Sequence, residues 1–253
     1  MFSVPMRSTL AKLPSGIVLA SALGPPRRVL PYPEPLASVL PDGGLPRGAV
    51  VEISSPAGLA ASAHIALEAC LAAQRESRLR GGESAWCAWL DPEATLNAPV
   101  LAYRGIDLDR LLIVRPPREK LARVAVRVAF SQVFSVVVVD TAGVPGARSH
   151  LPLDPWLRAA RKLAIAVEKG DTAVLLLTDT RAERKAPLPT AMRIELERPG
   201  HDWLSVRIAK ERSGRITPAR IVAFPPKEEE PFLFFPEEPS RPPLASTRRA
   251  EGA

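Results

Sequence analysis

Aromatic residues, cysteines and histidines are all scarce in this chain of 253 residues. Phe, Trp and Tyr make up 5% of it, against 46% for hydrophobic residues as a whole, so its core must consist mainly of Ala, Val, Leu and Ile. Two cysteines are too few for a disulfide framework, and buried thiols in a reducing cytoplasm are expected. The histidines His64, His150 and His201 share no metal-ligand spacing, so no metal site is expected.

Long apolar segments are also missing. No run approaches the ~18 consecutive apolar residues of a membrane span, and Pro5, Lys12 and Pro14 interrupt the apolar start of the chain, which makes it a poor signal peptide. We therefore expect a cytoplasmic protein without a membrane segment. Positive charge is abundant instead. The net charge of +7 favours acidic partners, among which nucleic acid is the commonest.

Prolines divide the chain into parts. The 28 prolines crowd residues 25–46 and the stretch from Pro225 onward, and both stretches are interpreted as linker or tail. We expect an N-terminal segment with a proline-rich linker over residues 1–40 and a core domain over 41–225. An acidic, proline-rich tail over 226–253 is expected to be disordered.

One apolar island interrupts this tail. It consists of Phe232, Leu233, Phe234 and Phe235, with glutamates on both sides. A short apolar cluster in acidic, proline-rich surroundings suggests a peptide that docks on a partner. The alternative is that the cluster packs back on its own domain, and the sequence leaves both readings open.

Strand-like and helix-like segments alternate between the two proline-rich stretches. This alternation predicts an α/β fold whose mostly parallel sheet is flanked by helices. After Thr190 two segments of alternating polarity predict an antiparallel extension at the sheet edge. The predicted strands are 50–54, 85–90, 111–114, 136–139, 172–178, 192–196 and 204–209, and the predicted helices are 60–78, 94–103, 119–130 and 155–168.

The first strand and helix enclose a loop with the spacing of a phosphate-binding GxxxxGK[ST] motif, but without its chemistry. In a working loop the glycines let backbone N–H groups surround the phosphates, the lysine neutralises them, and the hydroxyl holds magnesium. Here Ala61 stands in the place of the lysine, and only Ser62 keeps its hydroxyl. The degenerate loop comprises Ser55, Pro56, Gly58, Ala60, Ala61 and Ser62.

Four motifs in a common order resemble the core of the RecA recombinases, over roughly residues 38–225. They are GGLPRG at 43–48, CAWLDPEA at 87–94, GIDLDRLL at 105–112 and VVVVDT at 136–141. The resemblance implies a RecA-like core. It also implies that Glu93 matches the catalytic glutamate and that Asp140 matches the Walker B carboxylate that helps to hold magnesium.

The departures from RecA are as informative as the matches. The lysine is absent, both DNA-binding loops are short, and the polymerising amino-terminal helix is not evident. A small protein of this kind resembles the ImuA family, which is RecA-like or SulA-like. That resemblance implies an accessory role in damage-induced translesion synthesis, with an ImuB-like protein and an error-prone DNA polymerase as partners.

The loss of the lysine decides our expectation for catalysis. Without a cation, the carboxylates of Glu93 and Asp140 would repel a triphosphate, so both are interpreted as degenerate remnants and no cofactor is expected. We expect a non-catalytic adaptor in SOS mutagenesis. A residual ATPase with an unconventional phosphate loop and a SulA-like cell-division inhibitor are the alternatives.

Two basic clusters are further candidates. Arg181, Arg184 and Lys185 follow a buried strand, where RecA proteins meet single-stranded DNA, and they could give weak, salt-sensitive DNA contacts. Lys210 and Arg212 match lysines that reach across the RecA filament interface, and Arg215 is nearby, so RecA is a possible partner. The alternative for these three is a solvated basic strand edge.

Overall fold

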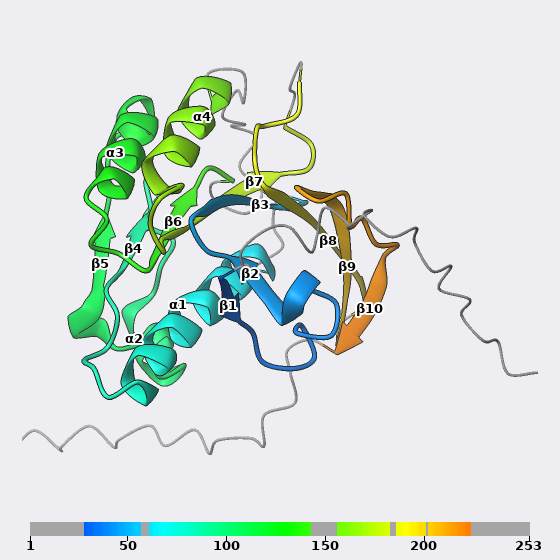
Figure 1. Cartoon of the computed structure of the whole chain (residues 1–253), viewed down its shortest axis with the longest axis horizontal. Helices are drawn as coiled ribbons and strands as arrows, with labels where there is room; N and C mark the ends of the chain where they lie inside the picture. The colour runs from blue at the N-terminus through cyan, green and yellow to red at the C-terminus, as the bar shows by residue number, and fades with distance from the viewer. Residues whose placement is uncertain (1–27, 57–60, 143–155, 183–185, 201, 224–253) are drawn as a thin grey trace, which may run out of the picture.

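The computed structural model describes residues 28–56, 61–142, 156–182, 186–200 and 202–223. An eight-stranded sheet in the order β10-β9-β8-β3-β7-β6-β4-β5 forms the centre of the fold (Figure 1). Pairing is parallel from β8 to β5 and antiparallel from β8 to β10, which confirms the expected mostly parallel sheet and its antiparallel extension. The strands are β3 (Ala49–Ser55), β4 (Cys87–Leu90), β5 (Leu111–Val114), β6 (Val136–Asp140), β7 (Ala173–Asp179), β8 (Met192–Gly200), β9 (Trp203–Glu211) and β10 (Arg220–Ala223).

Helices cover both faces of this sheet (Figure 1). Because neighbouring side chains of a strand point to opposite faces, Val136 and Val138 pack in one apolar cluster and Val137 and Val139 in another. The first cluster contains residues of α1 (Ala61–Leu79) and the second contains residues of α3 (Arg118–Phe130) and α4 (Trp156–Val167). Among the described helices, none combines the length and apolarity that crossing a bilayer requires.

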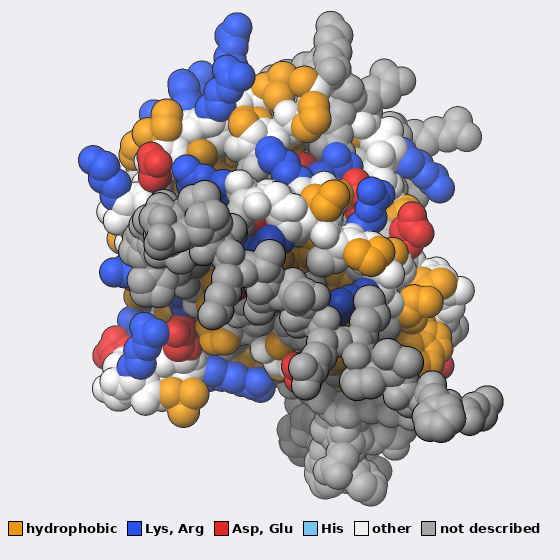
Figure 2. All heavy atoms as spheres, turned by 45° about the vertical axis from the view of Figure 1, so that its right-hand side comes forward, with side chains coloured by type: hydrophobic (Ala, Val, Ile, Leu, Met, Phe, Trp, Pro, Cys, Tyr) orange, Lys and Arg blue, Asp and Glu red, His pale blue; other side chains and the backbone are white. Residues whose placement is uncertain are grey.

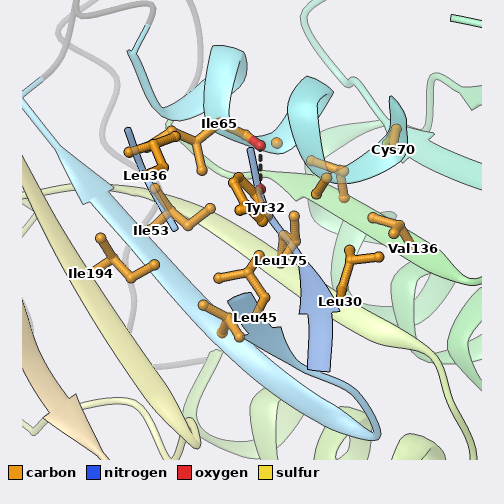
Figure 3. Close-up of a cluster of buried hydrophobic side chains, with 14 of the residues drawn as sticks. Leu30, Tyr32, Leu36, Leu45, Ile53, Ile65, Cys70, Val136, Leu175 and Ile194 are labelled. Atoms are coloured by element: carbon orange, nitrogen blue, oxygen red, sulfur yellow. Dashed lines mark hydrogen bonds between the residues drawn. The ribbon is translucent and has the colours of Figure 1, made fainter. Parts of the chain in front are cut away.

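The proline-rich segment before the sheet is part of the core. β1 (Val29–Pro31) pairs antiparallel with β2 (Gly44–Pro46), and a short 3-10 helix, Pro41–Gly43, precedes β2. Leu30 is fully buried, and the hydroxyl of Tyr32 donates a 2.6 Å hydrogen bond to the carbonyl of Ile65 on α1 (Figure 3). The linker interpretation of residues 25–46 is therefore wrong for the described part, from residue 28. Prolines interrupt regular structure, but they do not prevent the residues between them from being buried.

Most predicted elements are present, with small shifts at their ends. The largest difference is the helix expected over 94–103, which is confined to α2 (Ala98–Tyr103). The side chain of Asp91 accepts hydrogen bonds from the backbone amides of Thr95 and Leu96, and Ala94 has a φ of 55°, so the chain turns before the helix can begin. The short strands β1, β2 and β10 were not among the predicted elements.

Candidate functional site

The degenerate phosphate loop lies between the end of β3 and the start of α1. Ser55 closes β3, and its hydroxyl donates a 3.2 Å hydrogen bond to the hydroxyl of Ser62 in the first turn of α1. Pro56 follows β3 and is half-buried. Gly58 and Ala60 lie outside the described residues. The described end of β3 and start of α1 are therefore arranged like the strand and helix that flank a phosphate-binding loop.

The residue in the place of the lysine faces the interior. Ala61 is only 2% exposed and belongs to the apolar cluster beneath α1. A methyl group in this position offers a phosphate neither charge nor a hydrogen-bond donor. Any positive charge at this site must therefore come from another part of the chain.

Carboxylates gather at the same edge of the sheet, because the parallel strands β4, β6 and β7 all end there. Asp91 follows β4, Asp140 ends β6 and Asp179 ends β7. Each of the three side chains accepts a hydrogen bond from a nearby backbone amide. The amide nitrogens are those of Thr95 (2.9 Å) and Leu96 (3.0 Å) for Asp91, Ala142 (3.0 Å) for Asp140 and Arg181 (2.8 Å) for Asp179.

Glu93 has a different partner. Its carboxylate accepts a hydrogen bond from the guanidinium of Arg118, the first residue of α3, and the two side chains form an ion pair. Both side chains are largely shielded, with exposed fractions of 21% and 31%. The hydrogen bond and charge of Arg118 hold the pKa of Glu93 below its usual value. The carboxylate matched to the catalytic glutamate is therefore occupied by an internal cation.

This arrangement limits the chemistry of the edge. A triphosphate approaching it would meet several fixed carboxylates, while the guanidinium of Arg118 is already engaged by Glu93. Among the described residues, no group of three or more His, Cys, Asp and Glu side chains could hold a metal ion.

Sequence reasoning missed the roles of Asp91, Asp179 and Arg118. Asp91 and Asp179 lie at the ends of buried strands, a position from which their roles could have been predicted. No pattern in the neighbouring sequence indicates the role of Arg118.

The basic residues assigned to a partner interface have unequal environments. The ammonium group of Lys210 donates to the carbonyl of Leu188 at 3.2 Å, and Arg212 is exposed. Arg215 instead donates two hydrogen bonds of 2.7 Å to the carboxylate of Asp42, which raises the pKa of its guanidinium. Arg215 therefore fastens the end of β9 to the N-terminal segment, a structural contact that the interface assignment did not foresee.

Lys210 and Arg212 do not lie beside the carboxylates. They line a cleft of about 480 Å³ at the other end of the strands, where β3 begins. The floor of the cleft is mostly apolar, and Glu168 at the end of α4 adds an acidic group. Further residues of the cleft are Val50, Ile165, Pro189 and Thr190.

The remaining candidates are only partly described. Arg181 is exposed just after β7, at the edge where the carboxylates gather. Arg184 and Lys185 lie outside the described residues, as does the apolar cluster Phe232, Leu233, Phe234 and Phe235.

Comparisons with known proteins agree with this fold. The family model described as the MT3502 N-terminal domain matches residues 38–179. Protein RecA of Acidiphilium cryptum (strain JF-5) is 36% identical over 152 residues, which cover 55% of this chain and 42% of that protein. Protein RecA of Gluconacetobacter polyoxogenes is 34% identical over 151 residues, covering 55% and 41%.

A third relative extends the match. Protein RecA of Kineococcus radiotolerans (strain ATCC BAA-149 / DSM 14245 / SRS30216) is 30% identical over 176 residues, which cover 64% of this chain and 48% of that protein. The chain thus spans less than half the length of these curated relatives. Because the family match covers more than half of the chain and the sheet has the RecA-like arrangement, the chain belongs to the MT3502 N-terminal domain family and carries a RecA-like core.

Proposed function

We propose that this protein is a non-catalytic, RecA-like adaptor in DNA repair, and specifically in damage-induced translesion synthesis. The similarity to RecA supports a repair-type protein. The ion pair between Glu93 and Arg118 is the observation that supports the non-catalytic part most strongly. A general base must reach the attacking water, and a carboxylate held by a guanidinium is both less basic and less available.

The charge balance of the phosphate site supports the same proposal. In phosphoryl transfer, cations neutralise the charge that develops on the transferred group. At this edge the position of the lysine carries the buried methyl of Ala61, and the carboxylates of Asp140 and Asp179 are more than nine-tenths buried. The site therefore combines buried carboxylates with an alanine in the place of the principal phosphate-binding side chain.

An adaptor must act through its surfaces. An ImuB-like protein and an error-prone DNA polymerase are the proposed partners, in line with the resemblance to the ImuA family. RecA is a further proposed partner, through the cleft edge at Lys210 and Arg212, since Arg215 is engaged by Asp42. Arg181 is placed to add weak phosphate contacts with DNA at the opposite edge.

Phosphate release measured with ATP and magnesium tests the catalytic part. We expect the native chain and the Glu93→Gln variant to show the same background rate, because Glu93 takes no part in hydrolysis. A comparison variant, Ser55→Gly with Ala60→Gly and Ala61→Lys, restores all three missing residues of the motif and is expected to bind a fluorescent ATP analogue better than the native chain. Circular dichroism checks that this variant folds, because Ala61 is buried. Magnesium-dependent release that disappears on Glu93→Gln would establish a residual ATPase and overturn the proposal.

Binding assays with purified partners test the adaptor part. We expect the chain to bind the ImuB-like protein or the polymerase without nucleotide. The charge reversals Lys210→Glu and Arg212→Glu together should weaken binding to RecA, whereas the double variant Arg158→Glu with Arg161→Glu on the exposed side of α4 serves as a control of equal charge change. Unchanged RecA binding in the double variant would exclude this edge as the RecA interface.

A further inference from the structure

The sheet ends in an open strand on the side of β10. β10 pairs with β9 along one edge, and among the described residues no strand pairs with its other edge. The apolar cluster that α3 and α4 form on their side of the sheet contains no residue of β8, β9 or β10. As far as the structure describes the chain, this end of the sheet therefore has a free edge and a face that α3 and α4 do not cover, and a free edge is a template for a further strand.

An apolar hollow lies on this end of the sheet. Pro199, Trp203 and Ile221 line a depression of about 250 Å³. Trp203 is 52% exposed and Ile221 is 63% exposed, and the two side chains share a face because Ile221 lies two residues from Ala223, the partner of Trp203. Figure 2 brings this side of the molecule forward and shows hydrophobic side chains at the surface among lysines and arginines.

An exposed tryptophan beside an aliphatic side chain is a typical anchor for an apolar partner. Trp203 pairs with Gly200 across β8 and β9, and a Cβ atom built on Gly200 would lie 3.6 Å from the ring carbon Cδ1 of Trp203. The indole ring therefore packs beside Gly200. Aromatic residues that line a pocket contribute disproportionately to binding. The hollow is thus suited to one or two large apolar side chains.

The chain itself supplies such side chains close by. It leaves β10 at Ala223, directly beside Trp203, and Phe232 follows nine residues later. Nine extended residues reach about 30 Å, and a return loop needs fewer residues than the eight between Ala223 and Phe232. Residues 232–235 are also bounded by Pro231 and Pro236, which favour extended backbone next to them.

The charges of the two parts are complementary. Five glutamates flank the apolar cluster, at 228–230 and 237–238. Along β8, β9 and β10 the exposed arginines Arg198, Arg207 and Arg220 outnumber the exposed acids Glu197 and Asp202. Arg207 pairs with Glu195 at 3.3 Å, so its charge is shared, whereas the guanidinium of Arg220 donates a 3.2 Å hydrogen bond to the neutral carbonyl of Ser38.

We propose that residues 232–235 add to the free edge of β10 as a further antiparallel strand. Alternate side chains of a strand point to opposite faces, so one pair from Phe232, Leu233, Phe234 and Phe235 covers the hollow at Trp203 and Ile221. The flanking glutamates then lie near the arginines of β9 and β10. This contact covers a strand edge that would otherwise be free to pair with another chain, and it is independent of the nucleotide site.

Disulfide trapping in the full-length chain tests the contact. The substitutions Ile221→Cys and Phe234→Cys place thiols on the two partners, while the native Cys70 and Cys87 are buried. Under mild oxidation we expect an intrachain disulfide to form at least about tenfold faster than in the control pair Ile221→Cys and Leu244→Cys, because docking raises the local concentration of the thiols. Equal rates, or a disulfide that only links two chains, would overturn the proposal.

Hydrogen exchange provides a second, independent measurement. Serine at all four positions 232–235 removes the apolar side chains without touching the described core. We expect the amides of β10 to exchange roughly tenfold faster in this variant, because the added strand no longer protects them. The Leu244→Ser control should exchange like the native chain. Identical exchange in the native chain and the four-serine variant would also overturn the proposal.

Discussion

At the scale of single residues, hydrogen bonds fix the positions of the carboxylates in the candidate site. Asp91, Asp140 and Asp179 accept hydrogen bonds from amides within five residues of themselves, whereas Glu93 is held by Arg118, which is 25 residues away. The first three contacts shape loops at the ends of strands. The fourth joins the loop after β4 to the amino end of α3, and it changes the chemistry of the residue matched to a catalytic base.

The ion pair predicts a pH dependence of stability. Because the folded-state pKa of Glu93 is lowered, the pair stabilises the fold above the pKa of an unfolded glutamate, about 4.3, and this stabilisation is lost as the pH falls through the lower folded value. We expect Arg118→Gln to reduce the free energy of unfolding at neutral pH by up to about 1 kcal/mol, since both side chains remain partly exposed. The reduction should shrink below about pH 4.

Urea unfolding of the native chain and the variant at several pH values measures this effect. The control is Arg123→Gln, which removes an exposed arginine from the same helix. It should cause no pH-dependent difference. A loss of stability from Arg118→Gln that is equal at neutral and acidic pH would show that the guanidinium acts by packing, with no contribution from the charge of Glu93.

At the scale of the elements, a buried polar contact ties three strands together. Glu52 on β3 is 1% exposed, and it accepts a 3.0 Å hydrogen bond from the hydroxyl of Thr178 on β7. Its other oxygen lies 3.8 Å from the Nε of Arg193 on β8. Glu52 pairs with Arg193 in the register of the parallel strands β3 and β8, so the contact joins the core of the sheet to its antiparallel extension.

This contact predicts a strong coupling between two substitutions. Arg193→Met removes the cation 3.8 Å from the buried carboxylate of Glu52 and also the 3.1 Å ion pair of Arg193 with Glu195, so we expect a loss of roughly 2–3 kcal/mol in the free energy of unfolding. The double variant Glu52→Gln with Arg193→Met should lose less than the sum of the single losses, because the attraction between Glu52 and Arg193 is counted in both single losses. Chemical unfolding of all four chains in a double-mutant cycle gives the coupling.

A matched control exists on the neighbouring strand. Arg207 on β9 also pairs with a glutamate, Glu195, but its side chain is 58% exposed. Arg207→Met should therefore cost no more than about 1 kcal/mol. Additive losses in the cycle of Glu52 and Arg193 would contradict the prediction and would indicate that water compensates the buried carboxylate.

At the scale of the whole molecule, the N-terminal segment belongs to the folding unit. Five of its large apolar side chains are buried in the cluster beneath α1 (Figure 3 labels three of them). Arg215 and Arg28 add contacts to Asp42 and Asp171, so the segment is joined to the loop after β9 and to the turn before β7. The five buried residues are Leu30, Tyr32, Leu36, Val39 and Leu40.

Removal of residues 1–40 should therefore prevent cooperative folding. Burial of each large apolar side chain contributes about 1.5–3 kcal/mol, and the sum over five is comparable with the total stability of about 5–15 kcal/mol that is typical of a domain. Circular dichroism on heating is expected to show no sharp transition. The matched variant Tyr32→Phe, which loses only the hydrogen bond to Ile65, should cost about 1 kcal/mol. A truncated chain that unfolds like the native one would contradict the prediction.

Much of the fold could be predicted because its signals are local. The β-branched run of Val136–Val139 predicts a buried strand, and the alanine-rich stretch after Ser62 predicts a helix, both from local sequence pattern alone. The carboxylate of Asp140 could be located for the same reason, since it ends a strand that is recognisable. The segment from residue 28 to 46 could not, because its structure depends on burial against α1, which is remote in sequence.

The amino-acid sequence by itself determined the alternation of strands and helices and the concentration of acid and proline in the tail, and it predicts the loss of a phosphate-loop lysine at Ala61. These are properties of composition and short-range spacing. Only the tertiary structure decided that Glu93 forms an ion pair with Arg118 and that Arg215 forms one with Asp42. It also decided that Lys210 and Arg212 lie where β3 begins, at the other end of the strands from the carboxylates. Such contacts join residues distant in the chain, and packing brings them together in ways that no local pattern encodes.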